Sequence, residues 1–303
     1  MSPRNLNNYF FKLKKHNFII GENVKKLCIF ISILIFFTIN ILGSESSLIK
    51  SAKDNIYNNE LEKARAILNK CIEKYPDSYK AYYWLGFIDG QESKWDNMIK
   101  HFNQCLSISD KFSKEILHLK EQYYSDLLGK GQKLFKSAFG KLGEIELLKK
   151  QGKIGVHESD IDYEIKKRKL KNKPEKSKWN INKLETEVKE AFREIAATQE
   201  AALKINPNSI EASQYLSRAL LMLNEQEKLI ESFKKLLTKN PNHKFALSTL
   251  AEIYYDEGIR NECHESLKKS VEYNERLLNI ESGNKDVLNK IKKAKEVLEK
   301  NNQ

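Results

Sequence analysis

Residues 82–86 read Tyr-Tyr-Trp-Leu-Gly, and they are followed by an aromatic residue, Phe102, and a small one, Cys105. The same order of residue types recurs in four stretches, which begin near Glu45, Tyr79, Ile210 and Lys244. The first two starts are 34 residues apart, and so are the last two. A fixed period of this length is typical of stacked helical hairpins, so the sequence predicts an all-α fold.

The four stretches share small residues at their eighth position, namely Ala52, Gly86, Ser217 and Ala251. Their twenty-fourth positions are large and apolar, namely Leu68, Phe102, Phe233 and Leu267. In this pattern the chain resembles the tetratricopeptide repeat (TPR) family. The resemblance implies a solenoid of helical hairpins in which position 8 lies against position 20, occupied here by Ala64, Met98, Leu229 and Cys263.

The resemblance also divides the chain into repeats. It implies two repeats over residues 45–112, two more over residues 210–277, and a C-terminal capping helix within residues 278–303. Within that last segment, Asp286–Lys300 carries apolar residues on one face and lysines on the other, which is typical of a helix that closes the end of a solenoid.

Residues 113–209 fit a third TPR-like repeat, because Pro207 closes a helix as the repeat requires. Its helices are expected near Ser113–Leu134 and Leu184–Lys204. A charged insertion at about 140–182 interrupts this repeat. Within it, Glu144–Lys153 is expected to be helical, whereas Gly155–Lys178 has little apolar periodicity, so the sequence predicts that this latter part is a solvated segment.

The N-terminal part of the chain predicts a segment directed to a membrane. Residues 1–26 are basic, and Leu27–Leu42 are 16 residues without a charge. Signal-peptide cores have roughly 7–15 apolar residues and spanning helices roughly 20, so residues 27–43 are interpreted as either a signal peptide or a transmembrane helix. A start at Val24 instead of Met1 would shorten the leader, and both starts stay open. The basic flank orients the repeats away from the cytoplasm, so we expect a bacterial cell-envelope protein with extracytoplasmic (periplasmic) repeats.

The net charge of +12 is concentrated outside the repeats. Residues 1–26 and the run Lys166–Lys178 supply most of it, and the repeats themselves are close to neutral. We therefore expect no nucleic-acid partner. The basic run lies in the insertion, where contact with anionic lipid or an acidic partner is an alternative to simple solvation.

The sequence predicts no enzyme, no cofactor and no metal site. It contains no Gly-rich phosphate loop and no nucleophile signature, and its six histidines are scattered. The acidic stretch His157–Asp162 lacks the Gly and the terminal Glu of a calcium loop. Cys71 and Cys105 occupy the same place in successive repeats, beyond the ~7 Å reach of a disulfide, so we expect buried thiols.

A binding groove is the expected functional site. In the TPR family the first helix of each hairpin lines a concave groove through positions 2, 5, 9, 12 and 13. Carried over to this chain, those positions include the candidate residues Tyr57, Lys80, Tyr83, Phe87, Gln214, Arg218, Met222, Phe245 and Tyr255. Exposed aromatic side chains are typical anchors for a bound peptide or helix. Packing of the same residues against a neighbouring repeat is the alternative.

Two functions are therefore expected. The first is a non-enzymatic, monomeric adaptor that binds another protein or peptide in its groove, with the membrane contacted through Leu27–Leu42 if that segment is uncleaved. The second is a membrane-associated scaffold or spacer whose basic insertion contacts anionic lipid or an acidic partner. The capping helix favours the first, because a closed end prevents stacking of solenoids.

Overall fold

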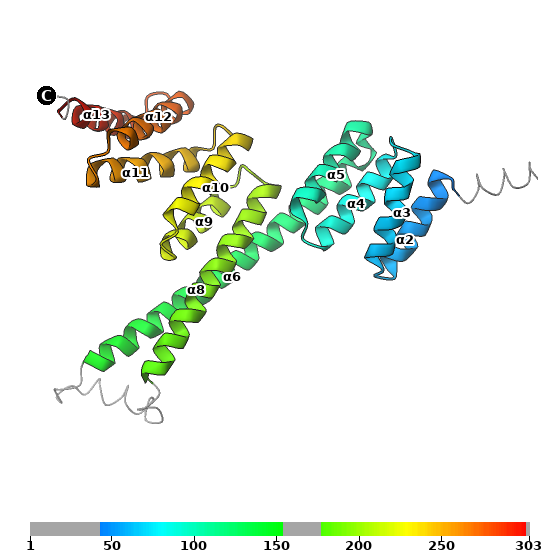
Figure 1. Cartoon of the computed structure of the whole chain (residues 1–303), viewed down its shortest axis with the longest axis horizontal. Helices are drawn as coiled ribbons and strands as arrows, with labels where there is room; N and C mark the ends of the chain where they lie inside the picture. The colour runs from blue at the N-terminus through cyan, green and yellow to red at the C-terminus, as the bar shows by residue number, and fades with distance from the viewer. Residues whose placement is uncertain (1–42, 154–176, 301–303) are drawn as a thin grey trace, which may run out of the picture. The chain divides into compact units, whose positions relative to one another are not determined.

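The computed structural model describes residues 43–153 and 177–300. These residues form helices joined by short connections, and no β-strand occurs among them (Figure 1). The all-α fold class expected from the sequence is confirmed for this part of the chain. The expected basic segment, the apolar run and the central part of the insertion lie outside the described residues.

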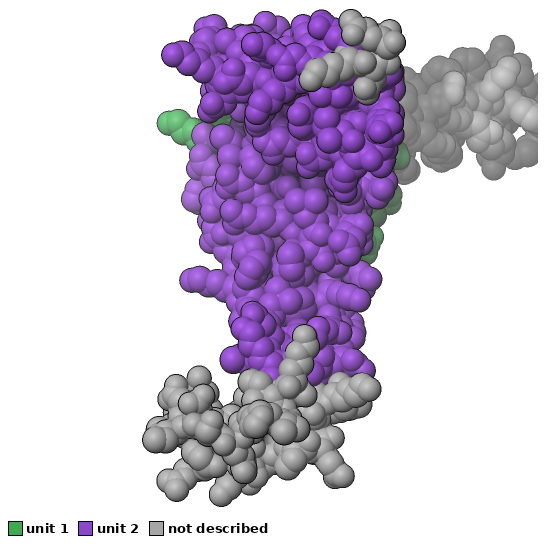
Figure 2. Space-filling model, turned by 90° about the vertical axis from the view of Figure 1, so that its left-hand side faces the viewer, with its two compact units in different colours: residues 1–116 green, residues 117–303 purple. Residues whose placement is uncertain are grey.

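The chain divides into two compact units, of which unit 1 ends at Ile116 and unit 2 begins at Leu117 (Figure 2). Unit 1 contains two helical hairpins. The first pairs α2 (Glu45–Tyr57) with α3 (Leu61–Lys74), and the second pairs α4 (Tyr79–Gln91) with α5 (Trp95–Ile108). A turn of 3₁₀ helix, η1 (Asp110–Phe112), follows them.

Local sequence explains where these helices begin and end. Ser44 and Ser78 precede α2 and α4, and each hydroxyl accepts a hydrogen bond from the backbone N–H three residues later. This is the favoured N-cap arrangement. The turns inside the hairpins each place one residue in the left-handed region, Asn59 at φ 59° and Ser93 at φ 58°. Equivalent residues in both hairpins therefore perform the same tasks, as a structural repeat requires.

The second hairpin packs most closely around Gly86. A β-carbon at Gly86 would lie only 2.5 Å from the ring of Phe102, which is fully buried on α5. The sequence predicted that position 8 would lie against position 20, which is Met98. In this hairpin the nearest neighbour is instead the ring at position 24, because the aromatic side chain reaches back across the helix crossing.

An ion network around the buried carboxylate of Asp89 ties α3 to the second hairpin. Arg65 Nη1 lies 2.7 Å from Asp89 Oδ1, a close ion pair whose groups are not aligned for a hydrogen bond. Asp89 is 0% exposed, and its other oxygen lies 2.6 Å from His101 Nδ1. Arg65 also pairs with Glu92, which Lys94 approaches at 3.0 Å. Buried carboxylates need such partners, because a single unpaired charge costs several kcal/mol.

Unit 2 begins within α6 (Ser113–Lys153). It continues through α8 (Ser177–Ile205), α9 (Ile210–Met222), α10 (Gln226–Lys239), α11 (Lys244–Arg260), α12 (His264–Ile280) and α13 (Lys285–Lys300). Its core is continuous, and the largest fully buried side chains include Phe192, Phe233 and Leu229. The helices α9–α13 thus share one core with the long helices α6 and α8.

The two helices in the region expected as a third repeat are longer than the sequence predicted. Helix α6 has 41 residues and α8 has 29, so both extend into the segment expected as an insertion. Figure 1 shows the two helices side by side over this length. Ion pairs Lys141–Glu187 and Lys149–Glu185, each at 2.7 Å, join them, and Ile145 is buried between them. Residues 154–176 lie outside the described part of the chain.

The last hairpin, formed by α11 and α12, differs from the expected repeat by one helical turn. Helix α11 has 17 residues, whereas α2, α4 and α9 each have 13. Helix α12 consequently begins at His264, and its fourth residue, Leu267, is fully buried. Leu267 takes the place that the sequence assigned to Cys263. The left-handed turn residue is accordingly Glu262 at φ 50°, and Gly258 stays helical against Leu267.

Helix α13 covers α12 with one apolar face. Val287, Ile291 and Ala294 are buried, whereas the lysines at positions 285, 290, 292, 293 and 295 are exposed. No helix within residues 43–153 and 177–300 combines the length and the apolar character needed to cross a membrane.

Candidate functional site

The nine residues expected to line one groove are divided between the two units. Tyr57, Lys80, Tyr83 and Phe87 belong to unit 1, and Gln214, Arg218, Met222, Phe245 and Tyr255 belong to unit 2. Each unit is therefore considered separately as a binding surface.

Tyr83 has a packing role in unit 1. Its side chain is only 9% exposed, and its ring stacks on Phe112 with centroids 4.1 Å apart and planes 20° apart. It also contacts the rings of Trp84 and Phe102. Little of its surface is accessible to a partner, so the expected anchor is better explained by the alternative of packing between neighbouring elements.

The other three candidates of unit 1 differ widely in exposure. Phe87 is half-buried and packs edge-on against Trp84 with ring centroids 5.5 Å apart. The Lys80 ammonium lies 5.8 Å from the centroid of the Tyr79 ring. Tyr57 is 75% exposed at the end of α2. A single exposed aromatic side chain is common on protein surfaces, so unit 1 offers no concentrated apolar site.

In unit 2, helix α9 presents three candidates with different surroundings. Gln214 is half-buried, and Arg218 is exposed with its guanidinium 6.0 Å from the centre of the Phe135 ring on α6. Met222 is 45% exposed, and its neighbour Leu221 is 46% exposed. Arg218 and Met222 thus retain surface with which a partner can make polar and apolar contacts.

Helix α11 positions the most developed part of the predicted groove. Phe245 is half-buried and packs edge-on against Phe233, which anchors it to the core. Tyr255, three turns later, borders a hollow of about 240 Å³ between α11, α12 and α13. The lining residues are Ala251, Glu252, Tyr255, Asp256, Ser270, Asn274, Lys290 and Lys293. Glu252, Tyr255 and Asp256 are the residues of α11 at groove positions 9, 12 and 13.

The walls of this hollow are polar and held in place. Asn274 is 3% exposed and donates a hydrogen bond of 3.0 Å to the Ser270 carbonyl. The Ser270 hydroxyl donates in turn to the Ala251 carbonyl at 2.8 Å. Across the opening, Lys290 Nζ lies 2.7 Å from Glu252 Oε1 and links α13 to α11. A fixed wall of this kind costs a ligand little reorganisation.

The charges around the hollow balance, since two carboxylates face two lysines. A strongly charged ligand is therefore not favoured. A neutral side chain that stacks on Tyr255 and hydrogen-bonds to the polar wall fits the arrangement best, as is usual in peptide recognition by helical grooves.

Sequence reasoning missed the contributions of α12 and α13 to this hollow. Lys290 and Lys293 were expected only as the solvated face of a capping helix. Asn274 takes the place in its helix that Cys71, Cys105 and Leu236 take in theirs, each being the eleventh helical residue. A polar residue at an apolar repeat position is a usable signal, but the extra turn of α11 concealed it.

No metal-binding cluster of three or more His, Cys, Asp or Glu side chains occurs within the described ranges 43–153 and 177–300. Cys71 and Cys105 are free and buried, as the repeat positions predicted. Burial raises the pKa of the Cys105 thiol to about 11, which makes it a poor nucleophile. The thiols of this helical fold thus serve packing rather than chemistry at these two positions.

Comparison with known proteins agrees with the geometry of the first hairpin. The family profile described as tetratricopeptide repeat matches residues 47–78, which include most of α2 and all of α3. Residues 47–78 are accordingly identified as a TPR repeat. Among curated proteins, no sequence matches the chain significantly.

Two solved structures share a distant likeness with the chain. The crystal structure of the P58(IPK) TPR domain is 13% identical, with a TM-score of 0.29 over 86% of this chain and 80% of that one. The assembly chaperone of RpL4 (Acl4), residues 1–338, is 11% identical, with a TM-score of 0.26 over 86% of this chain and 98% of that one. At these scores neither structure bears on the function of the chain.

Proposed function

We propose that the protein is a non-enzymatic TPR adaptor of the bacterial cell envelope that binds a partner protein or peptide through the first-helix face of unit 2. TPR repeats in general mediate protein–protein interaction, and residues 47–78 form such a repeat. The observation that carries the proposal is the hollow beside Tyr255, which combines an accessible aromatic ring with a fixed polar wall.

The proposed contact runs along α9 and α11. Met222 and Arg218 supply exposed surface on α9, and Tyr255 supplies the anchoring pocket on α11. An aromatic or aliphatic side chain of the partner is proposed to enter the hollow, because a few well-enclosed anchors dominate most protein interfaces. The remaining contacts then set the register of the bound segment.

The envelope assignment rests on the apolar run Leu27–Leu42 and the basic residues before it. We propose that this segment exports or anchors the chain, with the repeats on the extracytoplasmic side. A monomer is proposed because α13 covers the last hairpin with its apolar face and leaves lysines outside.

The test is capture of partners from envelope extract by the full-length chain and three variants. Tyr255→Ala should lose the captured partner, because truncation of a central aromatic anchor typically costs about 2 kcal/mol or more. Tyr255→Phe keeps the ring and should retain most of the binding. Tyr57→Ala is the matched control, since it removes an even more exposed tyrosine from unit 1. Equal recovery with Tyr255→Ala and the parent chain would refute the hollow as the binding site.

A further inference from the structure

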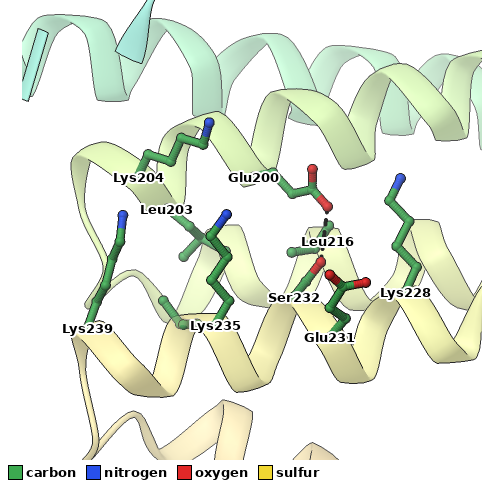
Figure 3. A pocket seen from close by; sticks show the side chains of 10 residues that line it. Glu200, Leu203, Lys204, Leu216, Lys228, Glu231, Ser232, Lys235 and Lys239 are labelled. Carbon is green, nitrogen blue, oxygen red and sulfur yellow. Dashed lines mark hydrogen bonds between the residues drawn. The ribbon is translucent and has the colours of Figure 1, made fainter. Parts of the chain in front are cut away.

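A second hollow of unit 2 plays no part in the proposed groove. It has a volume of about 250 Å³ and lies between α8 and α10, the second helices of two successive hairpins (Figure 3). Its lining residues are Glu200, Leu203, Lys204, Leu216, Lys228, Glu231, Ser232, Lys235, Leu236 and Lys239. None of them belongs to the nine residues predicted from the sequence.

The rim of this hollow is cationic. Four lysines border it and only two glutamates, of which Glu200 accepts a hydrogen bond of 3.1 Å from Ser232. Figure 3 shows Lys204, Lys235 and Lys239 at the end of the hollow where α8 and α10 finish. Lys235 and Lys239 are exposed and form no ion pair with another described residue. Their charges are therefore available to an anionic partner.

The floor of the hollow is apolar. Leu203, Leu216 and Leu236 line it from α8, α9 and α10, and all three belong to the core of unit 2. The volume is below the roughly 300–1,000 Å³ typical of pockets for drug-sized ligands. A single apolar side chain on the leucines, with charged neighbours reaching the rim, suits a hollow of this size better than a whole small molecule does.

A small free anion is a poor match for the same site. The hollow lies where α8 and α10 end, and the C-terminal end of a helix carries the negative end of its dipole. Glu200 and Glu231 add negative charge beside the floor. A phosphate group bound among them would lack the backbone N–H donors that usually hold it. Carboxylates carried on an extended partner can contact the outer lysines without approaching these glutamates.

We infer that the hollow between α8 and α10 is a docking site for an acidic segment of a partner protein. One apolar side chain of that segment lies on Leu203, Leu216 and Leu236, and flanking carboxylates pair with Lys235 and Lys239. The charge complementarity of the rim selects an acidic partner, and the leucine floor selects a peptide over a simple polyanion. This site is separate from the hollow beside Tyr255 and does not depend on it.

The probe is a fluorescein-labelled peptide with a central Leu flanked by Asp and Glu residues, titrated with the full-length chain and followed by fluorescence polarisation. The double variant Lys235→Glu/Lys239→Glu should weaken binding by roughly tenfold or more, because two attractive contacts become repulsive. Replacing the central Leu of the peptide with Ser should also weaken binding. Tyr255→Ala should leave it unchanged, which separates this result from the fate of the proposed groove.

The matched control is Lys189→Glu/Arg193→Glu, an exposed pair of cations on α8 with the same spacing and the same change in charge, outside the lining of the hollow. Circular dichroism verifies that each variant is folded. If the charge-reversal variant does not fold, the test is repeated with the milder variant Lys235→Gln/Lys239→Gln. Absence of peptide binding by the parent chain would overturn the inference. Equal weakening of peptide binding by both double variants would also overturn it. So would a chain that binds phosphatidylserine vesicles but not the peptide, if the vesicle binding is lost when Lys235 and Lys239 are replaced.

Discussion

Replacing Gly86 with Ala should destabilise unit 1, although Ala is the better helix former. Gly86 lies inside α4, where Ala is favoured over Gly by about 0.5–1 kcal/mol in the absence of other contacts. The added β-carbon, however, would lie 2.5 Å and 2.6 Å from two atoms of the Phe102 ring. Carbon atoms in contact prefer separations of about 3.5–4.0 Å, so either the ring or the helix must move.

The size of the effect follows from the balance of these two terms. Phe102 is fully buried and also contacts Tyr83, so its ring has no open space to enter. Overpacking of this kind typically costs about 1–3 kcal/mol. Subtracting the helix-propensity gain leaves an expected loss of up to about 2.5 kcal/mol in the free energy of unfolding of unit 1. A coupled double variant, Gly86→Ala/Phe102→Leu, should recover part of the overpacking cost, because the ring that causes the clash is gone.

The assay is urea unfolding followed by tryptophan fluorescence in a Trp179→Phe background, in which only Trp84 and Trp95 of unit 1 emit. The control is Gly140→Ala in α6, where a β-carbon meets nothing within 4 Å. That variant, followed by circular dichroism, should gain about 0.5–1 kcal/mol. A similar gain for Gly86→Ala would refute the close approach of α4 and α5 from which the expected loss is worked out.

Three further predictions concern acid stability, thiol reactivity and the N-terminus. Burial alone would raise the pKa of Glu92, but hydrogen bonds from neighbouring Lys and Arg side chains outweigh it and lower the pKa below 4.5. The urea midpoint of unit 1 should therefore fall as the pH drops below about 4.5, and Glu92→Gln should flatten this dependence. At mildly alkaline pH, peptide mapping should find Cys263 alkylated before Cys105, because the Ser266 hydroxyl lowers the pKa of the former and burial raises that of the latter. Mass measurement of the mature chain should find either a start within Ser44–Ser47 or a detergent-released chain that retains Leu27–Leu42. A full-length chain free in the cytoplasm would contradict both versions.

The repeat period predicted the hairpins well because it reflects packing that recurs. The four stretches identified from the sequence begin at the residues where α2, α4, α9 and α11 begin. Small residues at position 8 are needed wherever two helices cross closely, as Gly86 and Phe102 illustrate. This requirement is local and is visible in the order of residue types alone.

The same period failed to predict where α11 ends and α12 begins. Gly258 stands at the place where Asn59, Ser93 and Asn224 form left-handed turns, so its sequence position favours a turn there. Gly258 is instead helical, and its missing β-carbon admits Leu267 to within 2.5 Å of where that atom would be. A glycine permits both outcomes, and packing against the next helix decides between them.

The exposure of the candidate residues could not be predicted from their positions in the repeat either. Tyr57 and Tyr83 are both tyrosines at groove positions, yet one is 75% exposed and the other 9%. Part of the burial of Tyr83 comes from Phe112, which lies outside the aligned first helices and stacks on the Tyr83 ring. The position of a residue in the repeat predicts the face of the helix on which its side chain lies. Contacts with residues outside the repeat determine how much of that side chain is exposed to a partner.

The two hollows of unit 2 show how one architecture offers two chemistries. Stacked hairpins can form one hollow on the side of their first helices and another on the side of their second helices. The side chains that line each hollow determine whether it is neutral or charged. Around Tyr255 the opposing charges balance, whereas Lys235 and Lys239 give the other hollow an excess of positive charge. A partner with a neutral anchor and a partner with an acidic segment therefore need not compete. Because different side chains line the two hollows, the affinity measured at one hollow should stay unchanged when the other is occupied.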